Sequence, residues 1–261
     1  MILDKIILRT TERIEEKKRS LPLDLIKSKA LSMETEYTFP FEKALRTSEM
    51  AFICEVKRAS PSRGIIAEDF PYLDIAREYE QAGAAAVSVL TEPYYFGGSD
   101  AYLAEIAAEL HIPVLRKDFV VDKYMIYEAR LLGASAVLLI ASVLGKRLNE
   151  YINTAHSLGL SALVEAHTED EVMLSLRSGA RIIGVNNRNL KTFEVDTANS
   201  IRLRKAVPHN ILFVSESGIK TRADIELLQH NGINAVLIGE TLMQSVDKRL
   251  ALERLRGRAD E

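Results

Sequence analysis

Eight short apolar segments, each separated from the next by a longer segment, constrain the fold of this 261-residue chain more than any other feature. The short segments are mainly apolar and rich in β-branched residues, which is typical of parallel strands covered on both faces. We predict these strands at 52–56, 86–90, 113–115, 136–140, 162–164, 181–185, 211–214 and 235–238.

The longer segments show helical periodicity, at 73–81, 100–110, 123–132, 148–158, 169–178 and 222–230. Most of them are followed within two residues by a glycine, which tolerates the left-handed conformation at a helix C-terminus. These glycines are Gly83, Gly133, Gly159, Gly179 and Gly232. Eight such β-then-α units predict an α/β fold, a closed (β/α)8 TIM barrel. The alternative is an open doubly wound sheet, but no dinucleotide fingerprint GxGxxG is present.

The first 45 residues do not fit this repeat. They are too few to form a core of their own, so we expect one or two extra helices packed on the barrel. A length near 250 residues is usual for one barrel of this kind. We therefore predict a single domain over 1–261, with 1–45 as a helical extension.

Composition excludes several classes of function. The formal net charge of −3 gives no electrostatic reason to expect nucleic-acid binding. No apolar run is long enough to span a bilayer, and charges interrupt the apolar N-terminus, so neither a membrane partner nor a secretory signal is expected. A single cysteine, Cys54, suits a reducing cytosol, which predicts a cytoplasmic location. The scattered histidines predict no metal site.

Charged and polar side chains stand where several predicted strands end, and in such barrels function lies at the C-terminal ends of the strands. Because side chains two apart share a face, Glu55, Lys57, Lys117, Glu165 and Asn186 are predicted to face the interior. Pairing lowers the free-energy cost of burying these charges and shifts their pKa values, as acid–base catalysis requires. Each Glu–Lys pair alone is equally consistent with a structural ion pair, and the asparagine with a turn.

Two glycine-containing strand ends predict a phosphate site. Ser217 and Gly218 follow the seventh predicted strand, and Gly239 and Glu240 follow the eighth, where they resemble the first turn of a short helix. Backbone N–H groups after strands 7 and 8 are the usual phosphate cradle of this fold. Ordinary left-handed turns are the alternative. Glu240 would disfavour a phosphate unless its side chain points to solvent.

The chain resembles the indole-3-glycerol-phosphate synthase family in motifs that follow the family order along its whole length. They are FICEVKRASPSRG at 52–64, LTE at 90–92 with FGGS at 96–99, VLRKDF at 114–119, LVE at 163–165, GVNNRNL at 184–190, SESGI at 215–219 and LIGETLM at 237–243. The resemblance implies an enzyme that closes the indole ring of 1-(2-carboxyphenylamino)-1-deoxyribulose 5-phosphate with loss of carbon dioxide and water. It implies no cofactor, and it makes other tryptophan-pathway enzymes candidate partners.

The resemblance also implies roles for individual residues. Lys117 is the general acid at the sugar carbonyl, Lys57 pairs with an acidic group of the substrate and serves as the acid for dehydration, and Glu165 is the base. Glu55 positions Lys57. The remaining implied substrate contacts are with Asn186, Ser217, Ser60 and Arg188, and with an anthranilate pocket of Phe96, Phe119, Leu138 and Leu190.

Lysine serves as such an acid if its pKa falls toward neutrality, which a second cation and partial burial can cause, and we expect this of Lys117. The nearest alternative is a phosphate-binding barrel like phosphoribosylanthranilate isomerase. That chemistry needs a cysteine and an aspartate at strand ends, and the phase of Cys54 points it toward the helices. A further alternative is a barrel that has lost its activity and serves as a binding subunit. Such a barrel would lack at least one catalytic residue type, and this sequence lacks none.

Overall fold

The computed structural model describes residues 1–47, 49–189 and 192–259 and contains a closed barrel of parallel strands. The barrel strands are β1 (Ala51–Val56), β4 (Ala86–Leu90), β5 (Val114–Lys117), β6 (Ala136–Ile140), β7 (Ser161–Ala166), β8 (Ile182–Asn186), β9 (Leu212–Glu216) and β10 (Ala235–Ile238). The ring closes because β1 pairs with both β10 and β4, with Cys54 opposite Ile238 and Glu55 opposite Ser88. The predicted (β/α)8 barrel is thus confirmed.

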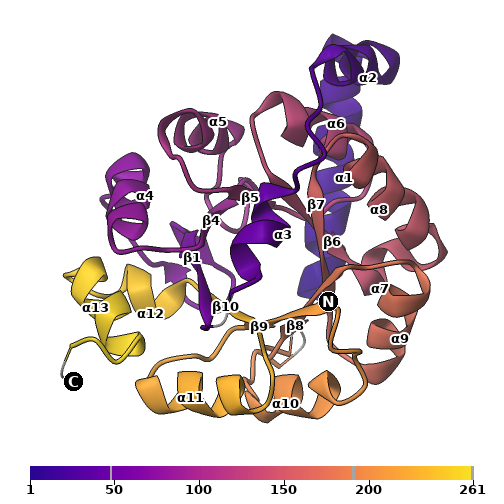
Figure 1. The fold of residues 1–261 in the computed structure, drawn as a ribbon. Coiled ribbons are helices and arrows are strands. Elements are labelled where there is room, and N and C mark those ends of the chain that lie inside the picture. Colours follow the sequence, from indigo (N-terminus) through magenta and orange to yellow (C-terminus); the bar gives the residue numbers. More distant parts are fainter. Residues whose placement is uncertain (48, 190–191, 260–261) are drawn as a thin grey trace.

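Helices surround the ring of strands (Figure 1). They are α4 (Tyr72–Gln81), α5 (Asp100–Glu109), α6 (Tyr124–Leu131), α7 (Ala141–Leu144), the 3-10 turn η1 (Gly145–Arg147), α8 (Leu148–Ser157), α9 (Glu169–Arg177), α10 (Ala198–Arg204), α11 (Arg222–His230), α12 (Glu240–Met243) and α13 (Lys248–Leu255). The five glycines that precede strands all have φ between 73° and 84°. This is the left-handed conformation expected after a helix.

The core has two layers, separated by the strands. Side chains such as Ile53, Leu115 and Leu163 fill the inside of the barrel, whereas Cys54 and Val87 belong to the layer between strands and helices. The alternation of side chains along each strand produces both layers. Cys54 therefore faces the helices, as its phase predicts.

Three helices precede the barrel, where one or two were expected: α1 (Ile2–Ser20), α2 (Leu23–Ser32) and α3 (Pro40–Leu45). In Figure 1, α3 lies over the centre of the ring and α2 projects beyond the outer helices. Phe41 and Leu45 of α3 are buried in the inner layer of the core, beside residues from the starts of the strands. The helix α3 therefore closes the N-terminal end of the barrel.

The long helix α1 lies at the opposite end, where Ile2, Leu3 and Ile6 line a cavity together with residues from the strand C-termini. It is attached there by a buried ion pair, in which Arg13 Nη2 lies 2.8 Å from Asp118 Oδ2. The two ends of the barrel are thus covered by different parts of the N-terminal segment.

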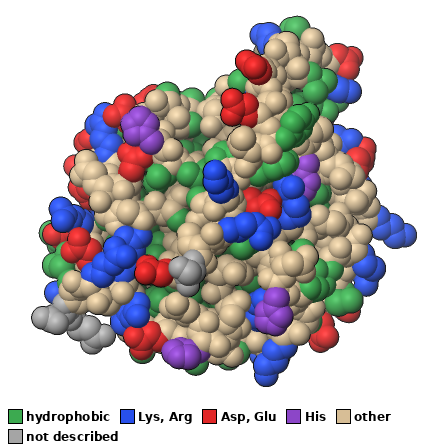
Figure 2. Space-filling view, in the orientation of Figure 1, with side chains coloured by type: hydrophobic (Ala, Val, Ile, Leu, Met, Phe, Trp, Pro, Cys, Tyr) green, Lys and Arg blue, Asp and Glu red, His purple; other side chains and the backbone are tan. Residues whose placement is uncertain are grey.

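Acidic and basic side chains are interspersed on the face shown in Figure 2. The mixture agrees with a formal net charge of only −3. Within the described ranges, no helix has both the length and the apolar character needed to cross a membrane. Most of the large apolar side chains are gathered in the two core layers.

Candidate active site

A cavity of about 1090 Å³ lies at the C-terminal ends of the barrel strands. Every predicted site residue that the structure describes lines it: Glu55, Lys57, Ser60, Phe96, Lys117, Phe119, Leu138, Glu165, Asn186, Arg188, Ser217, Gly218, Gly239 and Glu240. Leu190, which was also predicted, lies outside the described residues. Residues from far along the chain meet here because parallel strands end at the same rim.

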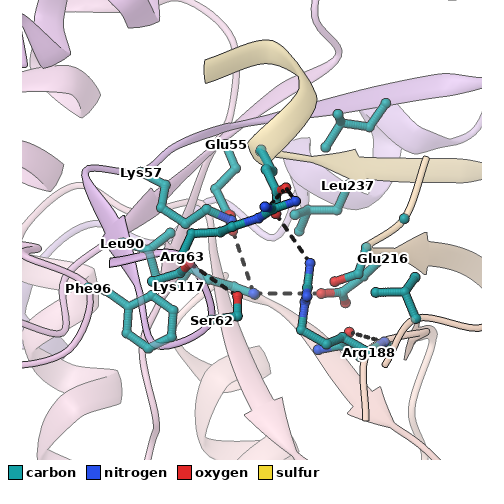
Figure 3. A pocket seen from close by; sticks show the side chains of 18 of the residues that line it. Glu55, Lys57, Ser62, Arg63, Leu90, Phe96, Lys117, Arg188, Glu216 and Leu237 are labelled. Carbon is teal, nitrogen blue, oxygen red and sulfur yellow. Dashed lines mark hydrogen bonds and ion pairs between the residues drawn. The ribbon is translucent and has the colours of Figure 1, made fainter. Parts of the chain in front are cut away.

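Glu55 links Lys57 to Lys117 in the cavity (Figure 3). Lys57 Nζ donates a hydrogen bond of 2.7 Å to Glu55 Oε1, and Lys117 Nζ lies 3.6 Å from Glu55 Oε2. Burial favours the neutral form of the Glu55 carboxyl, but the charges of Lys57 and Lys117 outweigh burial and lower its pKa. Glu55 therefore carries a negative charge between two ammonium groups.

The expectation of a lowered pKa for Lys117 is wrong. Burial disfavours its charged form, but the carboxylates of Glu55, Glu216 and Glu165 around it outweigh burial and raise the pKa above its ordinary value. The expectation took into account the charge of Lys57 but not that of Glu216, at the end of β9. Lys117 is consequently an ammonium group throughout the neutral range, so a proton is always present for donation.

Glu216 was not among the predicted site residues, although it lines the cavity at the end of β9. Its carboxylate oxygen Oε2 lies 3.6 Å from Lys117 Nζ, and the residue is only 1% exposed. Burial raises its pKa to about 8, the charge of Lys117 opposes the rise, and the charges of Glu165 and Glu55 add to it. Strand alternation would have found this residue, because Val214, two positions earlier, faces the inside of the barrel.

Two phenylalanines form an apolar wall on one side of the cavity. The ring centroids of Phe96 and Phe119 are 5.7 Å apart, with a tilt of 39° between the planes. The carboxylate of Glu92 holds the loop that carries Phe96, since it accepts hydrogen bonds from the backbone N–H groups of Tyr95 at 2.7 Å and Phe96 at 3.1 Å. Such a wall suits one face of a planar aromatic group.

Two arginines from other loops, Arg63 and Arg188, lie beside the strand ends predicted to bind phosphate. The helix α12 begins at Glu240, as expected. The Glu240 side chain points toward two arginines and not into open solvent. Its carboxylate lies 2.7 Å from Arg63 Nη2 and 3.3 Å from Arg188 Nη2. Arg63 comes from the loop after β1 and was not predicted. A Cβ at Gly239 would lie 2.5 Å from Glu55 Oε1 and 2.8 Å from Lys57 Nζ, so a larger residue there would displace the Glu55–Lys57 pair.

The two consecutive asparagines after β8 have different surroundings. Asn186 lines the cavity, and its Oδ1 accepts a 3.0 Å hydrogen bond from the backbone N–H of Arg188, which is turn chemistry. Asn187 is buried; its amide donates to Ser215 Oγ at 3.1 Å and accepts from Ser200 Oγ at 2.7 Å. Asn187 therefore fixes the ends of β8 and β9, and Asn186 remains at the cavity surface.

The sequence of this chain is similar to those of known proteins over nearly its whole length. The model of the family described as indole-3-glycerol phosphate synthase matches residues 3–255. The chain belongs to this family. The indole-3-glycerol phosphate synthase of Ruminiclostridium cellulolyticum is 56% identical over 99% of this chain and 100% of its own length. That of Endomicrobium trichonymphae is 55% identical over 94% of this chain and 95% of its own.

Solved structures of other proteins share the barrel of this synthase-family chain. A 3-hexulose-6-phosphate synthase has a TM-score of 0.63 at 14% identity and covers 81% of this chain with 100% of its own. A mutant tryptophan synthase alpha-subunit from Pyrococcus furiosus has a TM-score of 0.61 at 13% identity and covers 79% of this chain with 98% of its own. At such identities the likeness concerns the fold alone. Membership of the indole-3-glycerol phosphate synthase family does not favour the isomerase alternative.

Proposed function

We propose that this chain closes the indole ring of 1-(2-carboxyphenylamino)-1-deoxyribulose 5-phosphate, with loss of carbon dioxide and water, to give indole-3-glycerol phosphate. The proposal rests on one observation above all: in a chain of this family, Lys57, Lys117 and Glu165 all line one cavity at the strand ends. Acid–base chemistry in both steps requires proton donors and a base within reach of one bound molecule.

In the first step, Lys117 acts as the general acid. The ring carbon that carries the carboxylate attacks the sugar carbonyl, and Lys117 protonates the carbonyl oxygen as the new bond forms. Carbon dioxide then leaves, and its bonding electrons neutralise the iminium-like nitrogen, so no separate electron acceptor is required. The raised pKa of Lys117 keeps its proton in place until the attack begins.

In the second step, water is eliminated. Lys57 donates a proton to the departing hydroxyl, and Glu165 removes a proton from the adjacent carbon, so that a C–O and a C–H bond break as the ring double bond forms. Glu55 holds Lys57 by their 2.7 Å hydrogen bond. Glu216, carrying a proton over much of the neutral range, is a further hydrogen-bond donor beside Lys117.

The rest of the cavity binds the substrate in this proposal. The wall of Phe96 and Phe119, together with Leu138, receives the anthranilate ring. Ser60, Asn186 and Ser217 hydrogen-bond the sugar and carboxylate groups. The phosphate lies at the backbone N–H groups of Gly218, Gly239 and Glu240, where Arg63 and Arg188 supply positive charge. Cytoplasmic enzymes of tryptophan synthesis are the partners we infer.

The test is a continuous fluorescence assay for the indole product, with EDTA present and with the carboxyphenylamino-deoxyribulose phosphate as substrate. Fluorescence should rise with the wild-type protein. Lys117→Ala should reduce turnover by at least about a hundredfold, since a general acid contributes 10²–10⁴-fold. A flat trace from folded wild-type protein would refute the proposal, and wild-type turnover in Lys117→Ala would remove Lys117 from the mechanism.

A further inference from the structure

One histidine, His167, stands directly behind the proposed base. It follows β7 two residues after Glu165, so the two side chains leave the chain on the same side. His167 Nε2 lies 3.4 Å from Glu165 Oε1 and is shielded from solvent. On the other side of the ring, Nδ1 lies 3.3 Å from Oε2 of Glu171. The imidazole therefore bridges two carboxylates, of which one lines the main cavity and the other belongs to α9.

The second carboxylate is itself held in place. Glu171 Oε2 accepts a 2.7 Å hydrogen bond from the backbone N–H of His167, and its own backbone N–H donates to Thr168 Oγ1, the N-cap of α9. The amide of Asn199, on α10, donates a 3.2 Å hydrogen bond to the His167 carbonyl oxygen. Both the backbone and the ring of His167 are thus fixed by neighbouring elements.

The geometry determines the protonation state of the ring. An ionised carboxylate only accepts hydrogen bonds, so Nδ1 carries the proton of its hydrogen bond to Glu171. Nε2 has no hydrogen-bond partner among the described residues, and it faces the negative charge of Glu165 at 3.4 Å. The charged and titratable groups around the ring are Glu165 on β7, Glu171 on α9, Glu216 on β9, and Glu169, Arg202 and Lys205 at the adjoining outer cavity. Burial lowers the pKa of His167, but the hydrogen bond to Glu171 and the charges of Glu165, Glu171 and Glu216 outweigh burial and raise it.

We propose that His167 is a positioning residue for Glu165, and that its imidazolium form holds the carboxylate of the base in place. With Nε2 at 3.4 Å from Oε1, the positive charge holds that oxygen, and the other oxygen of Glu165 is left to take the substrate proton. His167 also lines an outer cavity of about 490 Å³, through which its proton can equilibrate with solvent. The inference depends on the proposed role of Glu165 as base.

Two substitutions separate the charge from the hydrogen bond. His167→Gln keeps a donor and loses the charge, whereas His167→Leu loses both. Turnover should fall in the order wild type, His167→Gln, His167→Leu, with a drop of roughly tenfold to a hundredfold in the leucine variant if the base is misplaced by a fraction of an ångström. KM should change little, because His167 touches no predicted substrate contact other than Glu165.

The pH dependence of kcat tests the charge of His167, because a purely structural role for this residue would leave that dependence unchanged. Because both variants lack the imidazolium, the alkaline limb of kcat that reports its deprotonation should be lost in both. Glu171→Gln should lower the pKa of His167 and move the alkaline limb of kcat to lower pH. Asp170→Asn, at the exposed neighbour of Glu171 on α9, is the matched control and should leave that limb in place.

The outcomes are distinguishable from failure of the proposed function. If wild-type protein forms no indole product, or Glu165→Gln is as active as wild type, the proposed function or the proposed base is refuted. If Glu165→Gln is inactive while folded His167→Gln retains wild-type turnover and an unchanged alkaline limb, only the inference about His167 is overturned. Thermal melting followed by circular dichroism identifies any variant that is unfolded. If His167→Leu is unfolded, His167→Gln, whose side chain is closest in shape to histidine, tests the inference.

Discussion

At the scale of single residues, the protonation of Glu216 is open to a direct measurement. Its pKa in the folded protein is about 8, above the ordinary value of 4.5, so the folded state holds a proton that the unfolded state releases. This contribution to stability is complete below pH 4.5 and is lost as pH rises through 8. It amounts to on the order of 5 kcal/mol, because one pKa unit corresponds to about 1.4 kcal/mol.

The measurement is urea unfolding of wild type and Glu216→Gln between pH 5 and pH 9. The amide that replaces the carboxyl group in this variant does not titrate, so the stability of wild type minus that of the variant should decline steadily as pH rises. A difference that stays constant over this range would contradict a raised pKa for Glu216. The same variant tests function, since the loss of an acidic donor beside Lys117 should lower kcat more than it changes KM.

The residues of the cavity also show how far sequence reasoning reaches. Alternation along strands correctly gave the inward phase of Glu55 and Lys57, which the structure places in the cavity. The pKa of Lys117 was mispredicted because a pKa depends on every charge within a few ångströms, and those charges come from strands distant in sequence. Neighbours across a barrel are not visible from local spacing.

At the scale of elements, apolar runs located the strands but not always their ends. The run at 113–115 corresponds to β5, which in fact continues to Lys117. Strands extend past the apolar signal because their last residues face the cavity, where charged groups are paired. The helix α10 was not predicted; it spans seven residues, too few to show a clear helical period. The same limit applies to α3, which has six.

The packing of β8 against β9 leads to a second prediction. A Cβ on Gly184 would meet the Glu216 carboxylate, so Gly184→Ala should push that carboxylate away from Lys117. We expect kcat to fall by about tenfold or more, as misplaced catalytic groups do. If displacement of Glu216 is the cause, the double variant Gly184→Ala/Glu216→Ala should have the same kcat as Glu216→Ala alone. If the two substitutions instead lower kcat by factors that multiply, displacement of Glu216 is not the reason for the effect of Gly184→Ala.

The contact between the loop after β1 and α12 gives a third prediction. Glu240 forms ion pairs with both arginines of the proposed phosphate site, Arg63 and Arg188. In Glu240→Gln the arginines are free to bind the substrate phosphate, so KM should fall a few-fold, since an exposed ion pair is worth up to about 1 kcal/mol. Turnover should be unchanged. Steady-state kinetics, with inorganic phosphate as a competing ligand, will measure the change, and a raised KM would mean that the ion pairs are needed to shape the site.

At the scale of the whole molecule, the N-terminal helices and the barrel share buried polar contacts, from which we infer that 1–261 folds as one domain. Arg13 of α1 bonds both carboxylate oxygens of Asp118, at 3.0 and 2.8 Å, and the carbonyl oxygen of Thr91 at 3.2 Å. Asp118 directly follows Lys117 and also accepts from the backbone N–H of Phe119. The helix thereby supports both a catalytic residue and the aromatic wall.

Arg13→Ala should therefore reduce stability and activity together. Removing Arg13 leaves Asp118, at 1% exposure, with the longer 3.8 Å contact to Arg116 as its remaining ion pair, and should lower the free energy of unfolding by up to about 3 kcal/mol. Arg9→Ala is the matched control on α1, because the Arg9–Glu12 pair is exposed and worth at most about 1 kcal/mol. If α1 folded independently of the barrel, urea unfolding of Arg13→Ala would show two transitions and turnover would match that of Arg9→Ala. A single cooperative transition at lower urea, with reduced kcat, requires that the helix and the barrel unfold as one unit and that the helix keeps Lys117 in position.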